Sequence, residues 1–334
     1  MGIRTRLTSA SVASGQAPPP VPLDMLAERL DGYARAARGA FADNTVRALH
    51  ADTRVFADWC RANHRQNIPA SSETVVAFID AMSQLKAPAT VRRYRSSIAA
   101  LHRAAELPNP CEAEVVRLAL RRMNRMRGVR QKQAEPLNRS AIERMVVAEA
   151  PDSSDLLGLR DAALISVAYD TLLRRSELVG LLIEDLQRAD DGGGTILVRR
   201  SKGDQEAAGT IKYLAPDTMA RVEAYLNFGM LAGGPLFRAV DKGGRPSRTP
   251  LEAQEVRRIF RKLAELADLR LSRPPSAHST RVGAAQDMLS AGLELSEVMQ
   301  AGSWKSVVMV ARYGERLLAR RGAARKLAAL QSRA

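Results

Sequence analysis

The sequence predicts a mainly α-helical protein with two domains, of which the second also contains a small antiparallel β-sheet. A chain of 334 residues is long enough for two domains that each bury a core of their own. Apolar residues recur at helical spacing through residues 23–126 and again after Pro216. Between them the period changes, because Thr195–Arg200 and Gly209–Leu214 are typical of strands and flank the polar turn Ser201–Ala208. We therefore expect one hairpin in an otherwise helical chain.

The first domain is predicted to be a compact helical bundle over residues 23–127. Residues 1–22, which precede it, are rich in Ser, Ala and Pro and contain no apolar signal core, so a flexible tail is expected. In the second helix Asn44 is the expected N-cap, and Leu49, Val55, Phe56 and Trp59 form the buried stripe. The expected helices are Leu23–Gly39, the helix capped by Asn44, Ser72–Leu85, Pro88–Glu106 and Val115–Met126.

A polar, charged linker, Gly128–Pro136, precedes the second domain, which we expect to occupy residues 137–334. Asn138 or Ser140 is placed to cap the first helix of this domain, and Gly292 is expected to end a later one. The expected helices are Ala141–Ala150, Leu156–Leu173, Arg175–Leu186, Asp217–Asn227, Glu252–Leu266, Val282–Leu289, Leu293–Ala301, Ser306–Tyr313 and a last one from about Glu315 to Leu330.

The strongest signal in the composition is charge. The chain has 51 Lys and Arg against 36 Asp and Glu, a net charge of +15. A balance this basic indicates a polyanionic partner, and nucleic acid is the leading candidate. No acidic residue occurs between Glu114 and Glu135, where seven basic side chains crowd together. Such a run is usually a solvated face, but at a domain boundary it also suits a segment lying along a phosphate backbone.

Arginines on the outer faces of the first-domain helices are the predicted DNA contacts. A compact bundle with basic outer faces can lay a helix into a major groove, whereas a protein-binding bundle is the alternative. The predicted contacts are Arg92, Arg93, Arg95, Arg117, Arg121 and Arg122.

The cysteine content and the hydropathy of the sequence indicate in which cellular compartment the protein is expected. Only Cys60 and Cys111 occur, without a CxxC pattern, so structural disulfides and a zinc site are not expected and a reducing cytoplasm fits. The most apolar stretch, Leu156–Leu173, is interrupted by Arg160, Asp161 and Asp170, which argues against a membrane span. We expect a cytoplasmic, DNA-associated protein with no membrane partner.

The stretch Ala277–Gly314 carries four side chains that can act together on a phosphate: His278, Arg281, Trp304 and Tyr313. Each taken alone has an ordinary explanation, such as a satisfied core pair or a buried ring with a bonded hydroxyl. His278 and Arg281 are three residues apart, so on a helix they share a face. Upstream, Arg174 lies in TLLRRSEL and Lys202 in RRSKGDQ, and together the set suggests a phosphate-handling site.

Arg, Lys, His-x-x-Arg, Trp and Tyr in that order resemble the tyrosine recombinase (phage integrase) family. The run RVGAAQDML, the phrase EVMQAGSW and Trp in the fifth place, where many members have His, look most like its Cre-like branch. The resemblance covers most of the chain, from about Leu26 to the last helix. It implies a helical core-binding domain at residues 23–127 and, after the linker, a catalytic domain of the DNA breaking-rejoining fold.

In such a site, charge on phosphorus must be held by cations, and the planar fork of Arg fits two phosphate oxygens. Arg174 and Arg281 can clamp the non-bridging oxygens. Arg175 is the rival of Arg174, but the family's R-x-S-E-L pattern fits from Arg174. Glu177 is then placed to hold an Arg or His in position, unless it forms only an exposed helical ion pair.

The resemblance implies that Tyr313 attacks phosphorus and forms a 3′-phosphotyrosyl bond, leaving a free 5′ hydroxyl. Lys202, near the hairpin tip, is the expected general acid, with Lys212 as the alternative. His278 either assists proton transfer or donates to the phosphate. Trp304 donates a hydrogen bond or packs beside the phosphate. The other tyrosines are expected to serve in packing.

The predicted function is site-specific recombination through a Holliday junction, without a metal or nucleotide cofactor. The expected partners are a double-stranded DNA site with inverted repeats and three further copies of the chain, linked by exchange of the C-terminal helix. That helix could instead fold back on its own domain. The alternatives for the activity are a type IB topoisomerase and a catalytically silent DNA-binding factor on the same scaffold.

Overall fold

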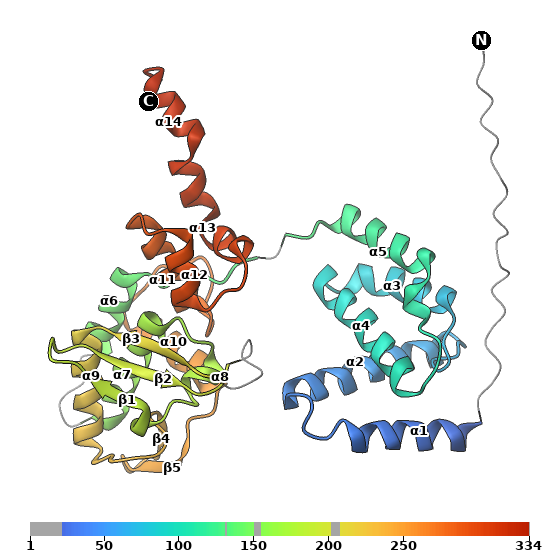
Figure 1. Cartoon of the computed structure of the whole chain (residues 1–334), viewed down its shortest axis with the longest axis horizontal. Helices are drawn as coiled ribbons and strands as arrows, with labels where there is room; N and C mark the ends of the chain where they lie inside the picture. The colour runs from blue at the N-terminus through green and yellow to red at the C-terminus, as the bar shows by residue number, and fades with distance from the viewer. Residues whose placement is uncertain (1–21, 131, 150–154, 202–207, 334) are drawn as a thin grey trace. The chain divides into compact units, whose positions relative to one another are not determined.

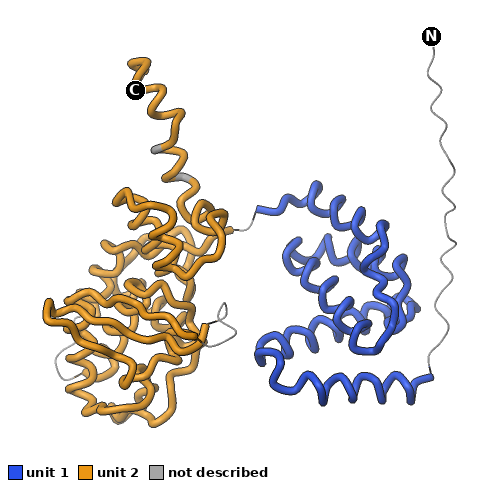
Figure 2. The backbone as a smooth tube through the Cα atoms, viewed as in Figure 1, with its two compact units in different colours: residues 1–131 blue, residues 132–334 orange. Residues whose placement is uncertain are grey.

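The computed structural model describes residues 22–130, 132–149, 155–201 and 208–333. The chain forms two compact units, Met1–Gln131 and Lys132–Ala334, shown in different colours in Figure 2. The boundary between them falls inside the predicted linker Gly128–Pro136. The predicted tail, residues 1–22, lies outside the described residues apart from Pro22.

The first unit is a bundle of helices around one core, as Figure 1 shows. Phe78 of α3 lies at its centre, with the rings of Phe56, Trp59 and Tyr94 within 5.8 Å of it. The predicted cap Asn44 is wrong, since Ala42 occupies the N-cap of α2 and makes no side-chain cap bond. The elements are α1 (Leu23–Ala36), α2 (Asp43–Ala62), α3 (Ser72–Leu85), α4 (Pro88–Ala104), the 3₁₀ helix η1 (Pro110–Glu112) and α5 (Glu114–Arg127).

Two buried polar side chains tie these helices together. The Asp52 carboxylate of α2 accepts hydrogen bonds from Arg93 Nε at 2.9 Å, Arg93 Nη2 at 2.7 Å and Ser97 Oγ at 2.9 Å. His102 of α4 accepts the Ala70 backbone N–H at its Nε2 atom, at 2.9 Å, while its Nδ1 bonds the Ile98 carbonyl. Hydropathy alone does not predict these contacts, because a polar Asp or His in a helix is ordinarily expected to face solvent, whereas Asp52 and His102 are buried.

The second unit is built around α7 (Leu156–Thr171), which is buried almost all round and packs against α6, α9 and α11. Asn138 caps α6, since its side-chain oxygen accepts the Ala141 N–H at 3.0 Å. The other helices are α6 (Arg139–Glu149), α8 (Arg175–Leu178), the 3₁₀ helix η2 (Ile183–Asp185), α9 (Pro216–Phe228), α10 (Glu255–Leu266), α11 (Ser279–Ser290), α12 (Leu295–Gly302), α13 (Val307–Arg321) and α14 (Ala323–Leu330).

The predicted hairpin is confirmed and belongs to a three-stranded antiparallel sheet, β1-β2-β3. The strands are β1 (Leu186–Arg188), β2 (Gly194–Val198) and β3 (Thr210–Leu214). Ile196 pairs with Leu186 on one side and with Lys212 on the other. Lys212 therefore lies in an edge strand of this sheet, beside the middle strand.

The predicted helix Arg175–Leu186 is wrong beyond Leu178. The chain leaves α8 because its backbone pairs with the segment around Pro235: Ile183 N–H donates to Gly234 O and Leu236 N–H donates to Leu181 O, both at 2.9 Å. A second hairpin, β4 (Arg238–Val240) and β5 (Pro246–Pro250), also contradicts the expectation that everything after Pro216 is helical.

The C-terminal region differs from prediction in where its helices break. Gly292, at φ +89°, follows α11 as expected. By contrast, α13 runs through Tyr313 without interruption to Arg321, and the break comes at Gly322 rather than before Glu315. In Figure 1, α14 extends away from the rest of its unit, and none of its residues is buried. Within the described residues, no helix is long and apolar enough to cross a membrane.

The burial of His102 predicts a pH-dependent stability of the first unit. Burial lowers the pKa of this imidazole, against the opposing hydrogen bond to Ile98 O. Below about pH 6.5 the imidazole of the unfolded chain is therefore protonated more readily than that of the folded chain. The free energy of unfolding then decreases as the pH falls, by at most about 1.4 kcal/mol per pH unit. In a Trp304→Phe chain, Trp59 is the remaining tryptophan and reports urea unfolding of this unit.

We expect the urea midpoint reported by Trp59 to decrease between pH 7 and pH 5. His102→Gln should lower the midpoint at pH 7 but flatten its pH dependence. His50→Gln, at an exposed histidine, is the matched control. Its urea midpoint should change with pH as much as that of the parent chain. If the urea midpoint of His102→Gln changed with pH as much as that of the parent chain, the pH dependence would not come from His102.

Candidate active site

Arg281 lies at the centre of the site and is 2 % exposed. Its Nη1 atom donates to Leu172 O at the end of α7, and its Nη2 donates to Gly302 O at the end of α12, at 3.0 Å. Its Nε has no hydrogen-bond partner among the described residues. Burial and the nearby Arg174 lower the pKa of Arg281 to about 10, opposed by Tyr313 and Glu177. The group stays protonated at neutral pH, so the site holds a buried positive charge whose Nε–H is unused among the described residues.

Arg174 is held by Glu177, the contact that the spacing of the two residues suggested. The Arg174 Nη1 atom donates to Glu177 Oε1 at 2.7 Å, and the Arg174 backbone N–H donates to Oε2 at 2.8 Å. The Glu177 side chain is 5 % exposed, whereas that of Arg174 is 34 % exposed. The pair is therefore no exposed helical ion pair. A buried carboxylate fixes a cation that can still be reached from solvent.

Two residues with acid–base capacity, His278 and Tyr313, meet directly. His278 occupies the N-cap position of α11, and its Nε2 atom lies 2.7 Å from the hydroxyl of Tyr313 on α13. Burial, together with Arg281 and Arg174, lowers the pKa of His278 to about 4. The imidazole is thus neutral at pH 7, and one of its nitrogens is free to accept a proton. Tyr313 itself is buried at 7 % exposure.

Trp304 packs between Arg281 and Tyr313. The Arg281 guanidinium lies 4.9 Å from the centre of the indole, and the Tyr313 ring lies 5.3 Å from it. Gly302 makes this position accessible, because a Cβ atom there would lie 2.1 Å from the indole ring. The indole face stabilises the buried guanidinium through a cation–π contact.

The predicted general acid, Lys202, lies outside the described residues. Its neighbour Ser201 lines a small crevice together with Arg174, Arg281 and Lys212. The alternative candidate, Lys212 on β3, is buried and donates to Ser303 Oγ at 2.8 Å. The sheet therefore reaches this crevice through Val198 of β2 and through Thr210 and Lys212 of β3.

The remaining tyrosines are separate from this cluster. Tyr94 and Tyr225 are buried in the two cores, as predicted, and Tyr169 donates to Asp287 Oδ2 at 2.5 Å. Tyr33 and Tyr213 do not pack as expected, since they are 39 % and 56 % exposed. Tyr313 is the tyrosine that the structure brings to Arg281 and His278.

Most of the arginines predicted to contact DNA already have partners inside the first unit. Arg93 is bound bidentately by the buried Asp52, and Arg122 by the exposed Asp80 at 2.8 and 2.7 Å. Arg121 is exposed on α5. The other pairs are Arg92 with Asn124 Oδ1 at 3.0 Å, Arg95 with Cys111 O at 2.8 Å, and Arg117 with Glu112 O at 3.1 Å and Glu114 at 3.0 Å. Arg92 and Arg95 are half-buried rather than fully outward.

Two glutamines near Tyr313 were not predicted from the sequence. Gln286 of α11 donates to Tyr313 O at 3.1 Å, and Gln133 donates to Arg312 O. Both bind carbonyls of α13 at the position of Tyr313. The phrase RVGAAQDML contained Gln286, but no pattern in the sequence marks an amide that binds the backbone of a distant helix.

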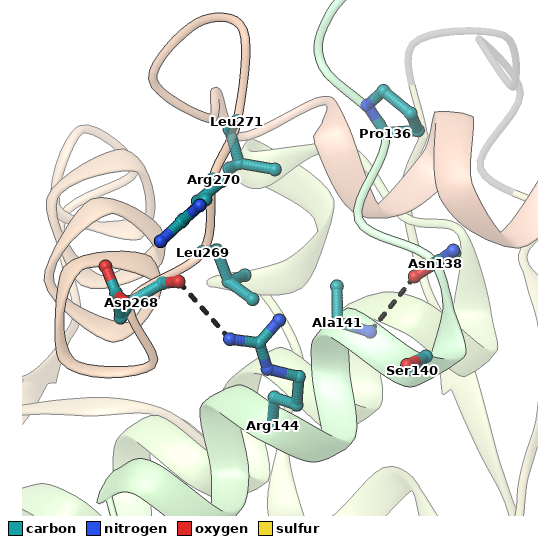
Figure 3. A pocket seen from close by; sticks show the side chains of 9 residues that line it. All are labelled: Pro136, Asn138, Ser140, Ala141, Arg144, Asp268, Leu269, Arg270 and Leu271. Carbon is teal, nitrogen blue, oxygen red and sulfur yellow. Dashed lines mark hydrogen bonds between the residues drawn. The ribbon is translucent and has the colours of Figure 1, made fainter.

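A larger cavity of about 390 Å³ lies elsewhere in the second unit, where α6 begins and α10 has ended (Figure 3). Arg144 reaches across it to the Asp268 carbonyl, and Asn138 caps α6 at its other side. None of the six predicted catalytic residues that the structure describes lines it. This cavity is therefore not where the titratable groups converge.

Known proteins resemble this chain in sequence and in fold. A family model described as the phage integrase family matches residues 130–318. The chain is 32 % identical over 303 residues to Recombinase cre of Escherichia phage P1, covering 86 % of this chain and 88 % of that protein. It is also 32 % identical over 283 residues to an integrase/recombinase XerD homolog of Selenomonas ruminantium, covering 82 % of each. Among solved structures, the Tn1549 transposon integrase in complex with circular intermediate DNA has a similar fold, at a TM-score of 0.61 and 15 % identity, over 85 % of this chain and 94 % of that one.

The contact between Gly302 and the indole predicts that Gly302→Ala displaces Trp304. An added methyl group cannot fit within 2.1 Å of the ring, so either the ring or the end of α12 must move. We expect a loss of about 1–3 kcal/mol in the stability of the second unit. In a Trp59→Phe chain, emission from Trp304 should shift to longer wavelength as the indole becomes more exposed.

Gly233→Ala is the matched control, because a Cβ atom at Gly233 meets nothing within 4 Å. Its emission and stability should equal those of the parent chain. Equal emission from Gly302→Ala and Gly233→Ala would show that the position of the Trp304 indole does not depend on Gly302.

Proposed function

Since the chain belongs to the phage integrase family, a family of DNA strand-transferring tyrosine recombinases, we propose that it cuts and rejoins DNA with Tyr313 as the nucleophile. The chain is a site-specific recombinase by this membership, and the proposal concerns which residues act and how. One observation carries it: the Tyr313 hydroxyl lies 2.7 Å from a neutral His278, beside the buried Arg281.

In the proposed first step, the Tyr313 oxygen attacks the phosphorus of a phosphodiester. The P–O5′ bond breaks, and a 3′-phosphotyrosyl bond replaces it. His278 Nε2 accepts the phenolic proton at the 2.7 Å separation. The low pKa of His278 reflects burial and the two arginines. A bound phosphate offsets those charges, so we expect the pKa of His278 to rise when DNA enters.

Arg174 and Arg281 hold the negative charge that builds on the non-bridging oxygens. The unused Nε of Arg281 and the accessible side chain of Arg174 support this role. Each guanidinium could contribute on the order of 3 kcal/mol to the transition state, the size of the loss when one oxyanion donor is removed. Both are in position before the substrate arrives, so little reorganisation accompanies the reaction.

Lys202 is proposed to protonate the departing 5′ oxygen. It follows Ser201, which lines the crevice with Arg174 and Arg281. The phosphotyrosyl bond conserves the energy of the broken phosphodiester, so attack by a 5′ hydroxyl can reverse the step without a nucleotide. A pair of such steps on each of two duplexes, through a Holliday junction, gives recombination.

We further propose that four copies assemble on two DNA sites with inverted repeats and exchange their C-terminal helices. The support is α14, which has no buried residue and extends from its own unit. Its exposed Leu327 and Leu330 form an apolar face that a neighbouring copy could cover. The first unit, with its basic α4 and α5, is proposed as the core-binding domain.

The decisive experiment maps covalent protein–DNA adducts on a pool of genomic fragments. Sequencing the trapped fragments would confirm the reaction and reveal the recognition site together. A chain that instead relaxes supercoiled plasmid lacking that site, without recombining, would be acting as a topoisomerase. No trapped DNA from any pool would contradict the proposal.

Tyr313→Phe tests the nucleophile. We expect the variant to bind the recovered site as the parent does but to form no covalent adduct on nicked suicide duplexes, because only the attacking oxygen is lost. Tyr169→Phe is the matched control and should still form the adduct. An adduct from Tyr313→Phe would identify another nucleophile.

Arg121→Ala tests the proposed contact of α5 with the phosphate backbone. An exposed arginine that neutralises one phosphate should lower the slope of log binding constant against log salt by about 0.9. Arg93→Ala should differ, since it strips a buried carboxylate of its partner and destabilises the first unit. An unchanged slope in Arg121→Ala would remove this residue from the interface.

A further inference from the structure

The turn that carries Trp304 is held from its other side by a lysine that sequence analysis had considered only as a proton donor. Lys212 of β3 is 7 % exposed. Its Nζ donates to Ala301 O, to Ser303 Oγ at 2.8 Å and, more weakly, to Gln300 O at 3.4 Å. These acceptors lie at the C-terminal end of α12, where carbonyls lack helical partners and a cation is favoured by the helix dipole.

Arg281 holds the same turn from the side of the nucleophile. It donates to Gly302 O, and its guanidinium lies against the Trp304 indole. Ser303, between these residues, adopts a left-handed conformation at φ 51°, which is unfavourable for a serine unless its surroundings impose it. The segment Ala301–Trp304 is therefore fixed between two buried cations that approach from β3 and from α11.

The geometry of the ammonium group limits what Lys212 can do chemically. An ammonium has three N–H donors, and three acceptors on α12 and Ser303 surround this one. No donor is left for a departing oxygen. A group that bound the Lys212 amine in the crevice that it shares with Arg174 and Arg281 would have to displace these contacts.

We infer that Lys212 is a positioning residue for strand transfer, which fixes the Ala301–Trp304 turn so that Trp304 and Arg281 keep their places beside Tyr313. The inference rests on the proposed function of Tyr313. It gives Lys212 a role distinct from that of Lys202, because Lys212 acts through the turn and does not touch the reacting atoms.

The charges around Lys212 give this role a pH dependence. Burial and the charge of Arg281 on α11 lower the pKa of Lys212 to about 8, while Glu177 on α8 opposes the shift. Arg174 lines the same crevice. Below pH 8 the ammonium can serve all three acceptors. Above it the neutral amine keeps two N–H groups, so one acceptor loses its donor and the turn loosens.

The first test needs no DNA. In a Trp59→Phe chain, Trp304 is the remaining tryptophan, and its emission is followed from pH 6.5 to 9.5. We expect a shift to longer wavelength with a midpoint near the pKa of about 8. Lys212→Met should be shifted at every pH and show no such midpoint. Lys242→Met, at an exposed lysine between β4 and β5, is the matched control. Emission from Lys212→Met equal to that of the parent would overturn the inference.

The second test measures adduct formation on nicked suicide duplexes that carry the site recovered from genomic fragments. Lys212→Met should slow the single-turnover rate at saturating DNA by roughly tenfold to a hundredfold, the size expected when a catalytic group is misplaced by about 1 Å. Its DNA affinity should stay unchanged, and Lys212→Arg should recover part of the rate. A parent rate in Lys212→Met would overturn the inference.

Two outcomes separate this inference from its premise. If the parent chain forms no adduct, the proposed function fails, while the emission experiment still decides whether Lys212 fixes the turn. If Lys212→Met does not fold, Ser303→Ala, which removes one of the three acceptors, replaces it. That variant should shift Trp304 emission and slow the adduct rate in the same direction, and parent values for both would overturn the inference.

Discussion

The burial of one guanidinium, that of Arg281, determines how the rest of the site is built. A charged group at 2 % exposure requires partners, and these are backbone carbonyls at the ends of α7 and α12 and the face of an indole. None of these partners carries a full negative charge. The nearest carboxylate, Glu177, is bonded to Arg174 instead. The second unit therefore holds an excess of positive charge at its site, and an anion that enters completes the set.

The packing around Arg281 also joins α11, the residues that follow α12, and α13. Arg281 and His278 begin α11, Trp304 follows α12, and Tyr313 lies within α13. The rings of Trp304 and Tyr313 pack in one cluster with Val282, Val298 and Val310. Beyond Tyr313, α13 continues to Arg321 and leads into α14, which is exposed. The exposed α14 is consequently joined through Gly322 to the helix that carries Tyr313, the proposed nucleophile.

The sequence predicted which side chains form this site better than it predicted the contacts that hold them in place. The order and spacing of Arg174, His278, Arg281, Trp304 and Tyr313 identified side chains that the structure gathers. The contacts of Lys212 were not predictable, since its acceptors lie about ninety residues further along the chain. The helix after Leu178 was wrong for a related reason: Leu181, Leu182 and Leu186 have helical spacing, but backbone pairing with residues near Pro235 overrides it. Local patterns report propensity and cannot report a partner that is distant in the chain.

The first unit shows the same limit for charge, because composition counts arginines without saying which are available. To bind a phosphate, Arg93 would have to leave Asp52, whose side chain is 1 % exposed, and stranding that carboxylate costs about 3 kcal/mol. Arg122 faces a smaller barrier, since Asp80 is 48 % exposed and surface pairs contribute about 0–1 kcal/mol. Exchange of carboxylate for phosphate thus costs less at Arg122 than at Arg93, although both occupy basic helix faces. The long-range attraction between the chain and DNA depends on the net charge of +15. Which arginines contact the phosphates depends instead on which of their carboxylate partners can be exposed to solvent at low cost.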